Sequence, residues 1–172
     1  YKWYGLSEQI KFPKLLKKYK LDIVHFPHFN VPVFYNKPFV VTIHDLIALK
    51  FPTTRATTLG PLKYFLKLFF SKIVIKHAIQ KSKQIIAISE FTKNDLVSFF
   101  KLKKSIENKI KVIYEGVTKL DKKTSQQSNS IENSPQFIGY DFILYIGSAY
   151  PHKNLEKLCE AFEKIDDLKL VL

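Results

Sequence analysis

A histidine and an aspartate stand side by side after a short apolar segment. The segment spans residues 39–43, and His44 and Asp45 follow it. A β-branched apolar run of this length is typical of a parallel strand buried on both faces, and open α/β sheets bind ligands where such strands end. We expect His44 to donate to a ligand oxygen or relay a proton, and Asp45 to orient it or cap the next segment. The alternative is a structural His-Asp turn.

Two further histidines, His25 and His28, flank the end of a second apolar run at residues 21–26. Their i, i+3 spacing could suit a metal, but the sequence offers no third ligand nearby. We therefore expect no metal site here, and assign both residues to packing or to ligand contact in a cleft.

Ser89 follows the apolar run 84–88, and we expect it to cap the helix that begins there. The alternative is that Ser89 contacts an acceptor or a sugar. A similar run at 109–114 ends at Glu115 and Gly116, which indicate the turn out of a domain's last strand.

A strand-to-helix turn later in the chain could meet a nucleotide. Residues 147–154 join an expected strand at 142–146 to an expected helix. Gly147 allows close approach, Lys153 supplies a point charge for a diphosphate, and Asn154 begins the helix, whose free N–H groups favour phosphates. The turn matches neither a GxGxxG nor a Walker motif. A surface lysine at a helix start is the alternative.

Strands and helices alternate along the chain. The apolar patterns predict strands at 21–26, 39–43, 84–88, 109–114, 142–146 and 168–172, and helices at 8–18, 58–80, 91–100 and 154–165. This alternation predicts an α/β protein with parallel sheets. The polar stretch 119–139 is interpreted as a linker or insertion between a domain at 1–118 and the start of another at 140–172. One βαβ unit cannot close a domain, so we expect the second to be truncated.

Residues 58–80 are strongly apolar and were tested as a membrane-surface helix. On an unbroken helix Lys63 and Lys67 share one side, whereas Lys72 and Lys76 fall nearly opposite. The segment lacks one clean basic face, so a kink or burial against a sheet is the preferred explanation.

The charge is strongly uneven. The chain has 28 Lys+Arg against 15 Asp+Glu, a net charge of +13, and residues 1–86 hold 15 of the basic residues with only 3 acids. This balance favours nucleic acid, an acidic membrane face or phosphorylated ligands as partners. An AT-rich genome, whose codons favour lysine at solvent-exposed positions, would explain the excess of positive charge equally well.

Several classes are excluded by composition. The single cysteine, Cys159, rules out a disulfide framework. No apolar run is long enough to span a membrane, and no secretion leader opens the chain. The sequence starts at Tyr1 and contains no methionine, so we expect a piece of a longer protein.

Five segments appear in a characteristic order. They are LDIVH at 21–25, VTIHDL at 41–46, IAISEFTK at 86–93, VIYEGV at 112–117, and LYIG at 144–147 with PHKNL at 151–155. In this order and spacing they resemble the group-1 (family 4) retaining glycosyltransferases of GT-B fold, and most closely the mannosyltransferases of polysaccharide biosynthesis.

The resemblance implies two Rossmann-like domains facing a cleft, both incomplete in this chain, with the acceptor on the first and a nucleotide-sugar donor on the second. His44 would lie beside the donor sugar, and Lys153 would bind the donor diphosphate. The family requires no metal cofactor. A saccharide or lipid-linked acceptor, a cytoplasmic location and peripheral contact with an anionic inner membrane face would follow.

The sequence also departs from the family. The N-terminal glycine-rich loop and the paired glutamates fall outside residues 1–172, and Ser148 to Tyr150 occupy the stretch where many members carry an arginine. The piece alone is therefore expected to be inactive. Two alternatives remain at this level: a basic nucleic-acid-binding protein, although no recognition helix is visible, and a non-catalytic glycosyltransferase-like remnant.

Overall fold

The chain divides into two compact units in the computed structural model. The structure describes residues 5–54, 60–117, 141–165 and 167–172. Unit 1 is Tyr1–Glu115 and unit 2 is Gly116–Leu172. The stretch 119–139, interpreted above as a linker, lies outside the described residues.

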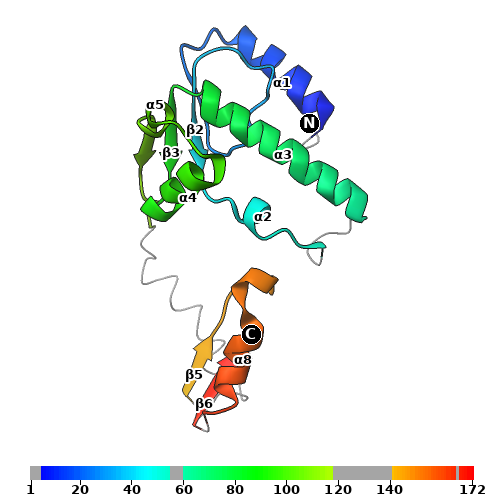
Figure 1. Ribbon diagram of the computed structural model, residues 1–172, viewed down its shortest axis with the longest axis vertical. Coiled ribbons are helices and arrows are strands. Elements are labelled where there is room, and N and C mark those ends of the chain that lie inside the picture. The colour runs from blue at the N-terminus through cyan, green and yellow to red at the C-terminus, as the bar shows by residue number, and fades with distance from the viewer. Residues whose placement is uncertain (1–4, 55–59, 118–140, 166) are drawn as a thin grey trace, which may run out of the picture. The chain divides into compact units, whose positions relative to one another are not determined.

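Unit 1 is an α/β layer structure built on four parallel strands (Figure 1). Its elements are α1 (Leu6–Lys18), β1 (Val24–Phe26), β2 (Phe39–Ile43), α2 (Ile47–Lys50), α3 (Pro61–Lys81), β3 (Gln84–Ala87), α4 (Glu90–Phe100), α5 (Lys104–Glu107) and β4 (Ile110–Val112). The strand order is β1-β2-β3-β4, and every pairing is parallel. The α/β class with parallel sheets, predicted from the alternation of apolar patterns, is confirmed.

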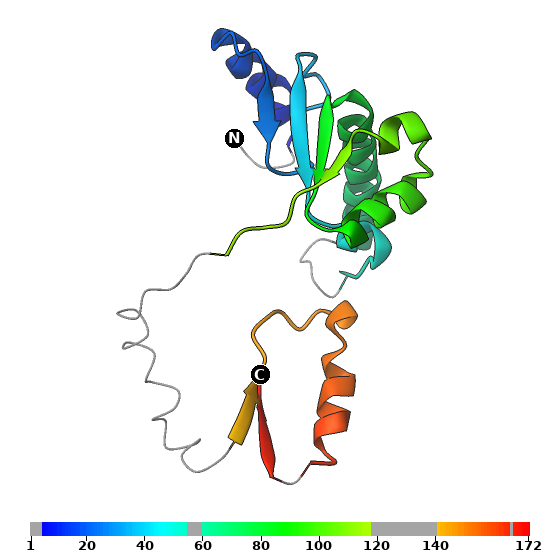
Figure 2. The ribbon, with the colours of Figure 1, turned by 90° about the vertical axis from the view of Figure 1, so that its left-hand side faces the viewer.

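The core of unit 1 lies between the sheet and its helices. Val41 and Ile43 of β2 pair in register with Ile85 and Ala87 of β3, and all four are fully buried. Figure 2 shows α3 and α4 on the same side of the sheet. Consecutive parallel strands that are joined by right-handed crossovers in one direction place their helices on one face, which explains this arrangement.

The opposite face of the sheet is less covered than the sequence suggested. Strand 39–43 is buried on both faces apart from Val40, as predicted. In β3, however, Ile85 and Ala87 are buried while Gln84 and Ile86 are only half-buried. Side chains alternate between the faces of a sheet, so apolar residues at successive positions could not reveal that one face is better covered than the other.

Helix α3 is unbroken over its 21 residues, and only its C-terminal part is buried. Its fully buried residues are Ile75, Ala78 and Ile79. The expectation that a kink or burial against the sheet explains this apolar segment is therefore wrong for its first half. Among the described residues, no helix has the length and apolar content needed to cross a membrane.

Unit 2 is a single βαβ unit. It contains β5 (Asp141–Leu144), the short 3-10 helix η2 (Pro151–Lys153), α8 (Leu155–Phe162) and β6 (Leu168–Val171). The strands pair in parallel, as predicted, and α8 ends at Phe162, earlier than the sequence pattern indicated. None of its described residues is fully buried.

Candidate functional site

The carboxyl ends of the four parallel strands bring polar residues to one edge of unit 1. His28 follows β1, His44 and Asp45 follow β2, Ser89 follows β3, and Glu115 follows β4. Parallel strands all end at the same edge of a sheet, so residues far apart in sequence become neighbours there. This edge is the candidate site.

His44 is held between two acceptors. Its Nε2 lies 2.9 Å from the carbonyl oxygen of Pro27, and its Nδ1 lies 2.9 Å from Oε1 of Glu115. A neutral imidazole carries one N–H, so both contacts are hydrogen bonds only when the ring is doubly protonated. The side chains of His44 and Glu115 are 41% and 60% exposed, so the pair is open to a ligand from solvent.

Glu115 was missed as a site residue by the sequence reasoning, which assigned it to a turn leaving the domain. The signal was available, because Glu115 follows the last predicted parallel strand and must lie at the same edge as His44. What the sequence lacked was any sign that the two side chains would meet, since a separation of 71 residues leaves no local pattern.

Asp45 starts the next segment. Its Oδ1 accepts a hydrogen bond of 2.9 Å from the backbone N–H of Ile47, the first residue of α2. Of the two roles expected for Asp45, the structure shows a contact with the next segment, although the N-cap of α2 is Leu46. Helix α2 is in turn fastened to α4, because Nζ of Lys50 donates to both carboxylate oxygens of Asp95 at 2.8 and 2.9 Å.

His28 lies close enough to His44 and Asp45 to interact electrostatically with both. The pKa of His28 lies below its ordinary value of 6.5, chiefly because burial disfavours the charged ring. The charge of His44 lowers this pKa further, and Asp45 opposes the shift. Nδ1 of His28 accepts a 3.3 Å hydrogen bond from the N–H of Asn30. Burial and the neighbouring His44 therefore disfavour the protonated form of the His28 ring.

Packing and ligand contact were both predicted for His25, and the contact that the structure shows lies within the sheet. His25 lies within β1 rather than beyond it, and its Nε2 is 2.8 Å from Oγ1 of Thr42 in β2. The structure joins His25 to its neighbouring strand and not to His44. Residue alternation explains the difference, because a side chain inside a strand points to a sheet face and not along the strand toward its end.

Ser89 is the N-cap of α4, as predicted. Its Oγ accepts a 3.1 Å hydrogen bond from the N–H of Thr92. Thr92 is itself buried, and its Oγ1 donates to the carbonyl oxygen of His44 at 2.9 Å. The start of α4 thus fixes the backbone of His44, a role for Thr92 that the sequence did not reveal.

The expected phosphate turn lies in unit 2. Gly147 follows β5, and a Cβ at this position would lie 2.8 Å from the hydroxyl of Tyr145, which donates to the carbonyl oxygen of Ser148. Lys153 is exposed at the end of η2. Asn154 adopts the left-handed conformation, with φ 54°, as the N-cap of α8 and makes no side-chain capping bond. The turn therefore presents a lysine beside a helix start.

The sequence of unit 1 matches a known family. The model of Glycosyltransferase Family 4 matches residues 2–119. The chain belongs to Glycosyltransferase Family 4. The match covers the whole candidate site of unit 1, from His28 to Glu115, whereas residues 141–172 lie beyond it. No curated protein matches the chain.

Membership of Glycosyltransferase Family 4 indicates the substrates of this protein in general terms. Transfer of a glycosyl group requires a sugar donor and an acceptor. In the described residues, no cluster of three or more His, Cys, Asp or Glu side chains has the arrangement of a metal site. The contact between His44 and Glu115 lies within the part of the chain that the family model matches.

Proposed function

We propose that this protein transfers a hexose, with mannose as the first candidate, from a nucleoside diphosphate sugar to a saccharide or lipid-linked saccharide acceptor. The observation that carries the proposal is the 2.9 Å contact between His44 and Glu115 at the carboxyl edge of a parallel sheet, inside a Glycosyltransferase Family 4 domain. A role in polysaccharide biosynthesis, in the cytoplasm, is part of the same proposal.

His44 would act on the donor sugar. Its Nε2 contacts the backbone carbonyl oxygen of Pro27. Its Nδ1, which contacts Glu115, is therefore the nitrogen that would bind a sugar oxygen in place of the Glu115 carboxylate. In this scheme Glu115 is a positioning residue that holds the ring until a ligand arrives. Asp45 would keep the loop after His44 in place through its bond to Ile47.

The donor diphosphate would bind in unit 2. Lys153 supplies a positive charge, and Asn154 and the start of α8 supply backbone N–H groups. Gly147 would allow the backbone of the turn to approach the phosphate closely. Basic groups and a helix start can neutralise the departing diphosphate, so we propose that no metal is required.

The reaction would proceed with retention. The bond between the anomeric carbon and the diphosphate oxygen breaks, and the diphosphate leaves with the electron pair. The acceptor hydroxyl attacks from the same face, and its proton passes to the departing phosphate oxygen. Lys153 at the phosphate would stabilise the negative charge of the departing diphosphate, and His44 would position the donor sugar by hydrogen bonding.

The test is a transfer assay on the full-length protein. Purified enzyme is given a panel of nucleoside diphosphate sugars with saccharide acceptors, and release of nucleoside diphosphate is measured together with the anomeric configuration of the product by NMR. Transfer with a retained anomeric configuration supports the proposal. Inverted product, or no donor consumed across the panel, rejects it.

A further inference from the structure

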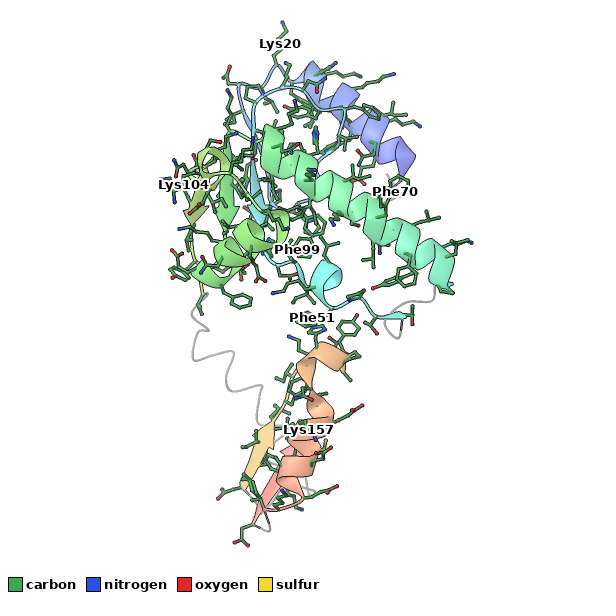
Figure 3. The ribbon with its side chains drawn as sticks, in the orientation of Figure 1. Lys20, Phe51, Phe70, Phe99, Lys104 and Lys157 are labelled. Carbon is green, nitrogen blue, oxygen red and sulfur yellow. The ribbon has the colours of Figure 1, made fainter. Side chains whose placement is uncertain are left out.

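Helix α3 has an apolar face that unit 1 does not use. At about 100° per residue, the buried residues Ile75, Ala78 and Ile79 define the side toward the sheet. On the other side stand six apolar residues that are 44% to 75% exposed. This outer stripe consists of Leu62, Phe65, Leu66, Phe69, Phe70 and Ile73. Phe70 is labelled in Figure 3, and the rings of Phe69 and Phe70 pack edge to face at 5.7 Å.

Lysines border the outer stripe on both sides. At about 100° per residue, Lys72 and Lys76 fall along one border and Lys63 and Lys67 along the other. The two lysine groups that looked contradictory in the sequence are therefore two flanks of one apolar surface. Helix α3 contains no Asp or Glu. Long lysine side chains beside an apolar face can reach up to phosphate groups while the apolar face is buried.

The composition of this surface distinguishes between possible occupants. Protein interfaces are depleted in lysine, whereas helices that lie in a membrane surface combine Phe and Leu on one face with Lys beside it. Unit 1 carries 21 Lys+Arg against 7 Asp+Glu, a net charge of +14. A negatively charged lipid surface attracts a body of this charge.

We propose that the outer stripe of α3 and its flanking lysines dock unit 1 onto an anionic lipid bilayer. The Phe and Leu side chains enter the boundary between headgroups and acyl chains, and the lysines contact lipid phosphates. Helix α3 leads into β3, which is parallel to β2, so the chain returns along α3 from the carboxyl edge of the sheet, where His44 lies, to the opposite edge. Docking brings the carboxyl edge to the bilayer surface, where a lipid-linked acceptor would be found. Only this last step rests on the proposed function.

The experiment measures vesicle binding by the full-length protein without any donor sugar. Vesicles of phosphatidylcholine, with or without phosphatidylglycerol, are sedimented with wild-type protein and with a variant that combines Phe65→Ser and Phe69→Ser. We expect wild-type to sediment with the anionic vesicles, and the double variant to bind about tenfold more weakly. Phe34→Ser is the matched control, because Phe34 is as exposed as Phe65, at 59%, but lies outside α3.

A charge-reversal series tests the flanks. Lys63→Glu with Lys76→Glu should weaken binding to anionic vesicles, whereas Lys83→Glu, an exposed lysine outside α3, should have a much smaller effect. Transfer to a water-soluble acceptor should be unchanged in all of these variants. Because vesicle binding needs no substrate, failure of the proposed reaction leaves this result interpretable.

Two results would overturn the docking proposal. One is equal vesicle binding by wild-type and the Phe65/Phe69 double variant. The other is absence of vesicle binding, combined with light scattering that shows a dimer for the wild-type protein and a monomer for the Phe65/Phe69 double variant. That result would assign the outer stripe to contact with a second copy of the chain.

Discussion

Nδ1 of His44 lies 2.9 Å from Oε1 of Glu115, although 71 residues separate them along the chain. The contact ties the end of β2 to the end of β4 across the carboxyl edge of the sheet. It also places a carboxylate oxygen where it can accept a hydrogen bond from Nδ1 of the ring when that nitrogen carries a proton. The pair is exposed, so its contribution to the free energy of unfolding is small, about 0 to 1 kcal/mol, and its importance is functional.

Replacing Glu115 by Gln should therefore affect transfer and not folding. We expect kcat to fall by about tenfold while the donor KM changes little, because an amide positions the ring less firmly and offers it no charge. Steady-state kinetics and thermal unfolding of the full-length enzyme measure both effects. Glu107→Gln is the control, since Glu107 pairs with Lys104 in α5. A Glu115 variant with wild-type kcat would refute the positioning role.

His44→Ala and Lys153→Ala test the two ends of the proposed donor. Each should lower kcat/KM by about a hundredfold, because His44 positions the donor sugar and Lys153 stabilises the charge of the departing diphosphate. Circular dichroism should show an intact fold, since Lys153 is exposed and His44 is partly so. Lys157→Ala is the matched control, because Lys157 is also exposed in unit 2 and pairs with Glu160. Near-normal rates in both site variants contradict the assigned roles.

Ser89→Ala separates a helix cap from a substrate contact. Loss of the cap should lower the free energy of unfolding by about 1 kcal/mol. If Ser89 only caps α4, kcat/KM at a temperature where the protein is folded stays within about twofold. Ser98→Ala, in the same helix, gives the baseline for losing an exposed hydroxyl that bonds the helix backbone. A large loss of kcat/KM without loss of stability would assign Ser89 to acceptor binding instead.

The stability of the protein should decrease as the pH falls below 6.5. Burial lowers the pKa of His28 and of His77 from this ordinary value, and a second positive charge, His44 or Lys81 respectively, adds to each shift. Below 6.5 the unfolded chain binds protons that the folded state does not, so unfolding becomes easier until the folded-state pKa is reached. Denaturant unfolding across this pH range measures the effect. His28→Gln with His77→Gln should flatten the slope, and an unchanged slope would assign it to other groups.

Transfer should continue when divalent metals are removed. If Lys153 and the start of α8 neutralise the leaving diphosphate, an excess of EDTA should leave the rate within about twofold of the untreated enzyme. The control is Lys153→Ala with and without added magnesium. Loss of activity in EDTA that magnesium restores would show that a cation, and not the lysine alone, carries the phosphate charge.

The sequence was sufficient for the strands, for the longer helices and for the class of fold, but it did not predict the short helices α2 and α5. Residues 39–43 were predicted as a strand with the bounds that β2 has, and the helix start at Ser89 was also predicted. Both depend on local physics: β-branched apolar runs favour strands, and a serine oxygen satisfies free N–H groups at a helix start. The carboxyl-end rule for parallel sheets then located His44 and His28 at a common edge.

The tertiary structure decided which of these residues meet. Only the register of four strands brings Glu115 to His44, places Thr92 under the carbonyl of His44, and directs His25 to Thr42. It also determined which apolar residues of α3 are buried in the core and which are exposed to solvent. A local sequence pattern shows which side chains are apolar. Whether an apolar side chain is buried depends on whether segments distant in the sequence cover it, so these contacts and exposed faces are visible only in the folded structure.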